Sequence, residues 1–216
     1  MASPNLVVIT GAVEGDLDEA VVRRLVEHVG AWPGPVHGRN GKTHLRQRLA
    51  GYNQAAYLSP WIVLVDLNHD AECAPPLRTS WLPNPAPHMC FRVAVRMVEA
   101  WLLADRERLS RFLSVHVSQV PMNPEAMDDP KRTMVELAQL SRRREIREDM
   151  LPRPGSGRTV GPAYTSRLIE FVVGTEAGWC PDIAARSSDS LDRCLSCLRR
   201  LVESKSSVRG VRSISR

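Results

Sequence analysis

The stretch LVVITGAVEGDLDEAVVRRLVEHVG, residues 6–30, predicts the class of the fold. Residues 6–13 are mostly apolar and rich in β-branched side chains, which is typical of a buried strand. Apolar residues then recur at helical spacing up to Gly30, at Leu17, Val21, Leu25 and Val29. A strand that passes directly into such a helix is the unit from which layered α/β domains are built.

The same alternation continues through the first half of the chain. Residues 31–41 are rich in Pro and Gly and are expected to form a loop before a second helix. The run WIVLVD at 61–66 is continuously apolar and closed by an acid, as in a buried parallel strand. Five prolines predict a long loop at 71–90, and a further strand is expected at 91–95, followed at once by a helix in MVEAWLLAD. The predicted fold class is therefore α/β, with a mostly parallel sheet flanked by helices.

The second half of the chain reads as helical. Helices are expected at 131–150, 164–173 and 191–202, with a loop at 151–162. We predict an α/β core at 1–125, a helical C-terminal part packed on it at 126–203, and a disordered tail at 204–216, which has little apolar surface.

The composition is that of a soluble globular protein, with 216 residues, 43% of them hydrophobic and 25% charged. The net charge of +5 and the pI of about 9.2 permit a nucleic-acid partner without demonstrating one. Aromatic residues make up only 5%, which argues against a stacking platform for single strands. No apolar run approaches the roughly 18 residues of a membrane span, and no signal peptide is recognised, so a cytoplasmic protein is expected.

The five cysteines are odd in number and scattered, which argues against a disulfide framework. Cys194 and Cys197 form a CxxC motif, but the surrounding LDRCLSCLRRLV has the pattern of an amphipathic helix. Without a second CxxC or a nearby pair of histidines, helix packing is favoured over zinc binding.

Acidic residues follow the predicted strands, although the chain as a whole is basic. Glu14 follows the first strand, Asp66 ends the strand at 61–66, and Glu99 comes soon after the strand at 91–95. In an open sheet of parallel strands, the carboxyl ends meet at one edge, where ligands bind. The side chains expected to gather there are Glu14, Asp18, Asp66, Asn68, Asp70 and Glu99.

Carboxylates held close together repel one another, and a bound Mg²⁺ or Mn²⁺ removes that cost. A divalent metal beside a polyanion is the chemistry of phosphoryl transfer. A structural interpretation stands beside this one: Asp18 and Glu19 are favoured in the first turn of a helix by its dipole alone, and Asp70 is also typical of a turn. Glu99, among apolar neighbours, is either a surface residue or a residue with a task.

The order of a strand, EGDLD, a helix, and a later strand ending in DLNHD resembles the TOPRIM domain. The chain looks most similar to a TOPRIM-like family of uncharacterised proteins, related to the nuclease part of overcoming-lysogenization-defect (OLD) proteins and often encoded beside an ATPase. The elements that carry the resemblance are VEGDLDE, GKTHLRQRLAGY, VLVDLNHDAECAPPL, FRVAVRMVEAWLLAD, DDPKRTMVEL and GPAYTSRLIEFV.

The resemblance implies a role for each matching residue. Glu14 matches the TOPRIM glutamate, Asp18 the second acid of that motif, and Asp66 the first aspartate of the DxD motif. Asn68 stands where the second aspartate is expected, which removes one charge from the site, and Asp70 is the residue that could compensate.

Phosphate contacts are expected elsewhere in the chain. Arg158 lies in the glycine-rich PGSGRTVGP, where a mobile arginine can reach a phosphate, and Lys131 in DDPKR can contact substrate or stabilise charge in the transition state. GKT at 41–43 does not complete a phosphate-binding loop, because Val36 stands where a glycine is required. Gly41 is instead expected to start the second helix, and His69 is the one histidine expected near the acids.

The leading hypothesis is a metal-dependent phosphodiesterase, a nuclease with Glu14, Asp66, Glu99 and Lys131 as catalytic residues. The resemblance adds an ATPase partner of the ABC or AAA type, encoded nearby, and a role in defence against phage or foreign DNA. The alternative is a catalytically weak or inactive TOPRIM-like subunit that binds or regulates an ATPase. A small-nucleotide or nucleotidyl-transfer enzyme is a third hypothesis. DNA and RNA are not distinguished, and a homo-oligomer is left open.

Overall fold

The computed structural model describes residues 6–212, and their side chains up to Ser204. The chain divides into two compact units. The sheet unit comprises residues 1–65, 75–93 and 193–216, and the helical unit comprises residues 66–74 and 94–192. The chain therefore passes between the two units four times, after residues 65, 74, 93 and 192.

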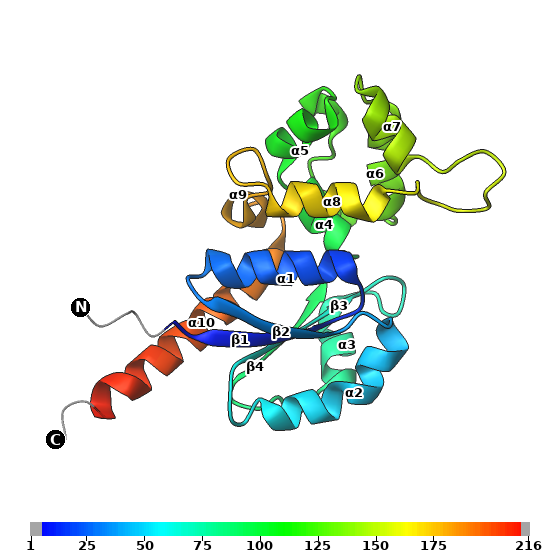
Figure 1. The fold of residues 1–216 in the computed structure, drawn as a ribbon. Coiled ribbons are helices and arrows are strands. Elements are labelled where there is room, and N and C mark those ends of the chain that lie inside the picture. Colours follow the sequence, from blue (N-terminus) through cyan, green and yellow to red (C-terminus); the bar gives the residue numbers. More distant parts are fainter. Residues whose placement is uncertain (1–5, 213–216) are drawn as a thin grey trace. The chain divides into compact units, whose positions relative to one another are not determined.

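A four-stranded parallel sheet forms the sheet unit, in agreement with the predicted α/β class (Figure 1). Its strands, in the spatial order β2-β1-β3-β4, are β1 (Val8–Val13), β2 (Trp32–Gly38), β3 (Trp61–Asp66) and β4 (Met89–Ala94). The first five residues of β3 are all buried, because helices cover both faces of this central strand. A strand buried on both faces reads as a continuous apolar run, which is why WIVLVD could be recognised from sequence.

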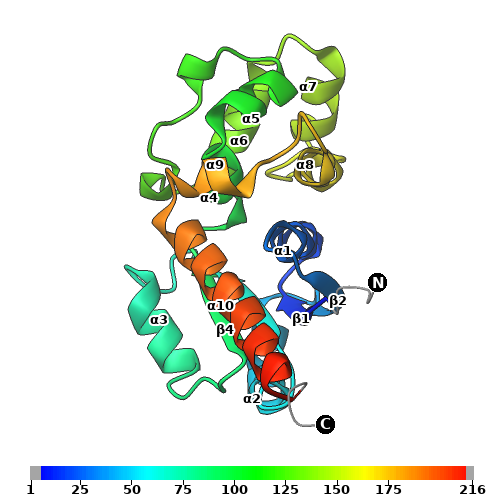
Figure 2. The same cartoon turned by 90° about the vertical axis from the view of Figure 1, so that its left-hand side faces the viewer.

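The helices of the sheet unit lie on both faces of the sheet. They are α1 (Asp16–His28), α2 (Lys42–Ala55), α3 (Ala74–Trp81) and α10 (Asp189–Arg212), whose first residues belong to the helical unit. Figure 1 shows α1 on one side and α2 and α3 on the other. Figure 2 shows α10 running alongside β4.

The helical unit is built around α4 (Val98–Leu103), all six residues of which are buried. Trp101 donates a hydrogen bond from Nε1 to Ser190 Oγ (2.7 Å), and its carbonyl accepts one from Trp179 Nε1 (3.1 Å). The surrounding helices are α5 (Arg106–Leu113), α6 (Pro130–Gln139), α7 (Arg144–Met150), α8 (Tyr164–Val173) and α9 (Pro181–Ala185), with short 3-10 turns at Val117–Gln119 and Pro124–Ala126.

The prediction of a loop is wrong for two segments, which form a strand and a helix instead. Residues 32–38 form the edge strand β2, whose Trp32 amide donates to Val7 O (2.8 Å). Its prolines are tolerated because an edge strand needs hydrogen bonds on one side only. Residues 74–81 form α3, since Pro75 and Pro76 fall in the first turn, where a helix does not use its amide hydrogens.

The predicted helix at 131–150 is instead two helices, α6 and α7. The chain breaks between them because Ser141 Oγ donates to Leu113 O and the Arg142 amide donates to Ser114 O (3.2 Å), so tertiary hydrogen bonds replace those of a continuous helix. The last helix is longer than predicted and runs to Arg212, past residue 204, because extending a formed helix costs little per residue. The rest of the predicted tail, 213–216, lies outside the described residues.

Gly38, the last residue of β2, provides a test of the sheet. Its φ is +97°, and a Cβ added there would lie 2.2 Å from Val13 O, on the backbone of β1. We expect Gly38→Ala to lower the free energy of unfolding by more than about 2 kcal/mol, as measured by urea denaturation followed by circular dichroism. Gly51→Ala is the control: this position is helical, with no atom within 4 Å of the added Cβ, so we expect a gain of about 0.5–1 kcal/mol. Equal stability of Gly38→Ala and the wild type would contradict this account.

Candidate functional site

The carboxyl ends of two neighbouring strands carry acids, as predicted. β1 and β3 pair in parallel, with Thr10 opposite Trp61 and Ala12 opposite Val63. Glu14 directly follows β1, and Asp66 is the last residue of β3. Glu14 and Asp18 belong to the sheet unit, whereas Asp66, Asn68, Asp70 and Glu99 belong to the helical unit.

Asp18 has a structural partner at the start of α1. Its Oδ2 accepts a hydrogen bond from the backbone amide of Gly15, the N-cap of α1 (2.8 Å), and the residue is only 8% exposed. Glu19, the next acid, forms ion pairs with Arg23 (2.8 Å) and Arg39 (3.2 Å). Of the two interpretations open for these acids, the structural one therefore has direct support.

The GKT segment also has a structural role. Gly41 is the N-cap of α2, as predicted, and its amide donates to Glu14 O (3.0 Å). The ammonium group of Lys42 lies 5.9 Å from the centre of the Trp81 ring, at the distance of a cation–π contact. This loop thus fixes the backbone of Glu14 rather than forming a cradle for phosphate.

Asp66 connects the end of β3 with the start of α4. Its Oδ1 accepts a hydrogen bond from the amide of Val98 (3.0 Å), the first residue of that helix. Asn68 has a φ of +50°, a left-handed conformation that Asn adopts more readily than most residues. The backbone amide of Asn68 donates to Arg96 O (2.8 Å), and the backbone carbonyl of Asn68 accepts from a guanidinium nitrogen of Arg96 (3.1 Å). Asn68 therefore has a role in the backbone of this turn, in addition to the ligand role that the resemblance implies.

The next two polar residues of DLNHD, His69 and Asp70, are exposed. The Asp70 amide donates to Leu67 O (3.2 Å), which closes a turn. The structure thus gives Asp70 both the turn geometry of the structural interpretation and the exposure that a ligand would need.

Two predicted catalytic residues meet within the helical unit. Glu99, in the first turn of α4, is only 2% exposed, and its Oε1 lies 3.6 Å from the Nζ of Lys131. Lys131, in the first turn of α6, has a side chain that is 46% exposed. The same Glu99 oxygen accepts a hydrogen bond from the Tyr164 hydroxyl (3.3 Å). Glu99 thus anchors a lysine that still reaches solvent.

Tyr164 is a member of this cluster that sequence reasoning missed. Burial raises its pKa well above the ordinary value, and the negative charge of Glu99 and the hydrogen bond to it act in the same direction. The hydroxyl therefore stays protonated and donates to Glu99. The sequence offered one signal for Tyr164, its position at the start of the helix predicted in GPAYTSRLIEFV. A search for charged residues does not select a tyrosine.

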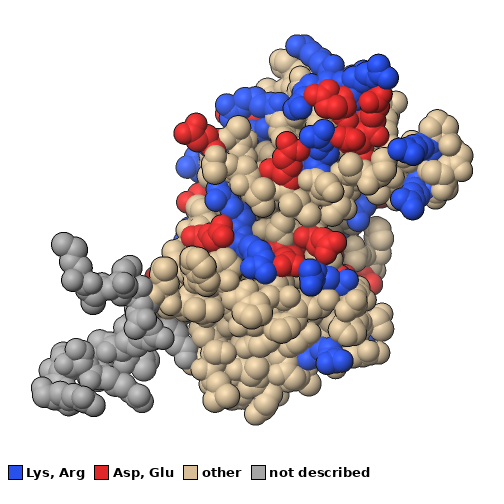
Figure 3. Space-filling model, in the orientation of Figure 1, with Lys and Arg blue, Asp and Glu red and all other residues tan. Residues whose placement is uncertain are grey.

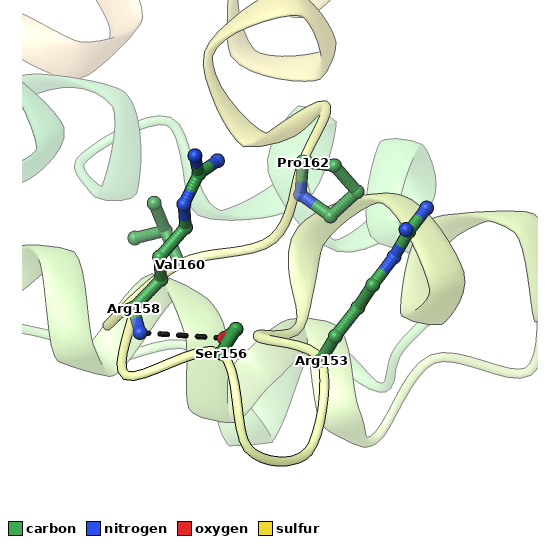
Figure 4. Close-up of a pocket in the computed structure, with 5 residues that line it drawn as sticks. All are labelled: Arg153, Ser156, Arg158, Val160 and Pro162. Atoms are coloured by element: carbon green, nitrogen blue, oxygen red, sulfur yellow. Dashed lines mark hydrogen bonds between the residues drawn. The ribbon is translucent and has the colours of Figure 1, made fainter.

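Arg158 lines a hollow in the loop after α7, as Figure 4 shows. The hollow has a volume of about 330 Å³ and is lined by Arg153, Ser156, Arg158, Val160 and Pro162. The two guanidinium groups extend in the same direction on either side of Pro162, and the Arg158 amide donates to Ser156 Oγ (3.3 Å). Arg153 was not singled out from sequence, although it stands in the same loop.

Charge distinguishes this loop from the helices next to it. Residues 151–163 contain two arginines and no acid. On the face drawn in Figure 3, basic and acidic side chains are interleaved over the rest of the helical unit. Arg144 with Glu148 (2.6 Å) and Arg167 with Asp149 (2.7 Å) are examples of such pairs. The loop is therefore better suited than its neighbours to an anionic group.

A search of the described residues finds no group of three or more His, Cys, Asp or Glu side chains that could hold a metal ion. Nor does any helix in the described part of the chain have the length and apolar character needed to cross a membrane. Comparison of the chain with protein-family models, with curated proteins and with solved structures finds no match.

Alkaline titration tests the Glu99–Tyr164 contact. The chain has three tyrosines, and we expect Tyr164 to ionise well above pH 10, in a separate step of the ultraviolet absorbance that Tyr164→Phe removes. Because folding raises this pKa, the stability it contributes is complete below the unfolded value of about 10 and is lost as the pH rises through the folded value. A Tyr164→Phe variant that leaves the titration at the highest pH unchanged would refute the contact.

Asp18→Ala separates capping from metal binding. Loss of the hydrogen bond to Gly15 should lower the free energy of unfolding by about 1 kcal/mol, to the same extent in Mg²⁺ and in a chelator. Asp16→Ala is the matched control, since this exposed acid shares the first turn of α1 but makes no capping bond. A loss of stability in Asp18→Ala that depends on Mg²⁺ would show instead that Asp18 is a ligand.

Proposed function

We propose that the protein is a divalent-metal-dependent phosphodiesterase, a nuclease in which Glu14 and Asp66 hold the metal. The observation that carries this proposal is the parallel pairing of β1 with β3, which gives the two carboxylates neighbouring strand ends. The edge beyond the carboxyl ends of parallel strands is where α/β proteins bind their ligands.

The donor set suits Mg²⁺ or Mn²⁺ better than a softer metal, because it consists of carboxylate oxygens. Mg²⁺ usually keeps several waters and takes only one or two carboxylates from the protein, with substrate phosphate completing its shell. Two acids at adjacent strand ends meet that requirement without a third protein ligand. When bound, the ion would supply positive charge to the phosphate oxygens and promote ionisation of water.

The residues of the helical unit have complementary tasks in this proposal. Lys131 offers a solvent-accessible ammonium group to the charge that develops on a phosphate, and Glu99 fixes its position. Tyr164 donates a hydrogen bond to Glu99 and so helps to hold that carboxylate in place beside Lys131. Arg153 and Arg158 bind a phosphate of the substrate in the hollow of their loop.

Substrate class and setting belong to the same proposal. The net charge of +5 suits a polyanion, either DNA or RNA. The ATPase partner and the role in defence against foreign DNA follow from the resemblance to TOPRIM-like proteins. The cytoplasmic setting, which is expected from the sequence, belongs to the proposal as well.

A second candidate is a catalytically inactive subunit that binds or regulates an ATPase. It is favoured by the structural partners of Asp18 and Asn68, two of the five predicted ligands, each of which has a structural role that needs no metal.

Cleavage of DNA and RNA oligonucleotides in Mg²⁺ and in Mn²⁺ tests the proposal. We expect Glu14→Gln to lower the rate by about 100-fold or more, because the neutral amide is a weaker ligand of similar size. Glu27→Gln, at the exposed far end of α1, is the matched control and should cleave like the wild type. Equal rates for Glu14→Gln and the wild type would refute the proposed site. Turnover of mononucleotides but not of oligonucleotides would favour the small-nucleotide enzyme instead.

A further inference from the structure

Three of the five cysteines lie together in the sheet unit. Cys90 belongs to β4, and Cys194 and Cys197 lie one turn apart on α10. The side chain of Cys90 hydrogen-bonds with those of both helical cysteines. Cys90 and Cys194 have no exposed surface, whereas Cys197 is half-buried. Cys197 is therefore the member of the cluster that a small solute can reach.

Two periodicities bring positive charge to this cluster. Side chains two residues apart on a strand share a face, so Arg92 points to the same side of β4 as Cys90. Phe91, between them, faces the other way and stacks on Trp81 of α3, with ring centroids 6.2 Å apart. On α10, Arg200 lies one turn beyond Cys197, on the same helix face, and hydrogen-bonds with it.

The cysteines differ in acidity. The hydrogen bond with Cys90, together with the charges of Arg92 and Arg200, lowers the pKa of Cys197 to about 6, although partial burial opposes the shift. Burial raises the pKa of Cys90 well above its ordinary value. Arg92 Nε is buried without a hydrogen-bond partner among the described residues, so a negative charge nearby is favourable. At neutral pH the cluster thus combines a thiolate at Cys197 with a thiol at Cys90.

We propose that Cys197 is a site of oxidation by hydroperoxides and that Cys90 resolves the oxidised form as a disulfide between β4 and α10. The Cys197 thiolate attacks one peroxide oxygen, the O–O bond breaks, and the hydroxide that leaves takes up a proton to become water. The sulfenic acid at Cys197 is then attacked by the Cys90 sulfur, which gives up its proton to the departing hydroxide. In sum, two thiols and one hydrogen peroxide give one disulfide and two waters.

Geometry selects Cys90 over Cys194 as the partner. Residues three apart on a helix have Cβ atoms about 5–6 Å apart, whereas a disulfide joins Cβ atoms about 3.5–4.5 Å apart. Cys90 approaches Cys197 from a different element and is not held to that spacing. The resulting bond would close a loop from residue 90 to residue 197, which includes residues 94–192 of the helical unit. The site is independent of the proposed nuclease activity.

Titration of the reduced full-length protein with one equivalent of hydrogen peroxide, followed by alkylation, tests this proposal. We expect the number of free thiols to fall from five to three, with a crosslinked peptide joining Cys90 and Cys197 in the mass spectrum of the wild type. Because the loop is long, the product should migrate faster on a non-reducing denaturing gel, and dithiothreitol should reverse the shift. Zinc that copurifies in stoichiometric amount and is lost in Cys197→Ser would overturn the proposal, as would a crosslink between Cys194 and Cys197.

Variants and pH provide the controls. Cys197→Ser and Cys90→Ala should both abolish the faster band, whereas Cys73→Ser, which removes an exposed cysteine outside the cluster, should keep it. Alkylation of Cys197 by iodoacetamide should be half-maximal near pH 6. A midpoint near the ordinary thiol value of about 8.5, or oxidation of Cys73 with Cys197 left intact, would overturn the proposal.

Discussion

The parallel pairing of β1 with β3 is the constraint on which the rest of the structure depends. Parallel strands are joined by crossover connections, so each strand is followed by a helix that returns the chain to the start of the next strand. The pairing also aligns the carboxyl ends of the strands, which fixes where Glu14 and Asp66 leave the sheet. A buried central strand such as β3 needs helices on both faces, and α1 and α2, on opposite sides, meet that need.

The helical unit begins where β3 ends. Asp66 accepts a hydrogen bond from the first residue of α4. The following turn is held by two hydrogen bonds between Asn68 and Arg96, one between backbone groups and one from the Arg96 guanidinium group to the Asn68 carbonyl. α4 in turn is the buried centre of the helical unit and carries Glu99 in its first turn. Asp66 therefore has two structural roles. Its carboxylate accepts the hydrogen bond at the start of α4, the helix that carries Glu99 of the Glu99–Lys131 pair. Asp66 is also the last residue of β3, which pairs with β1, the strand that Glu14 follows.

Sequence periodicity predicted the elements with a strong pattern and failed where context decides. β3 and α8 were placed with their bounds, because one is uniformly apolar and the other has a clear apolar stripe. β2 and α3 were missed because proline excludes a central strand or a helix interior but not an edge strand or a first turn. Asp18 shows a different limit of sequence reasoning, because an acid in the first turn of a helix can either cap that helix or bind a metal. The Cys90–Cys197 contact joins residues far apart in the sequence, so no local pattern announces it.

Isothermal titration of Mg²⁺ and Mn²⁺ into the protein is the measurement that tests the central claim, a metal site at the carboxyl edge of the sheet, most directly. It requires neither the proposed ATPase partner nor a substrate. The account predicts binding by the wild type that is lost in Glu14→Gln and retained in Glu27→Gln, with circular dichroism confirming that all three proteins are folded. Absence of binding by the folded wild type, or equal binding by Glu14→Gln, would contradict it and leave the inactive binding subunit as the better description.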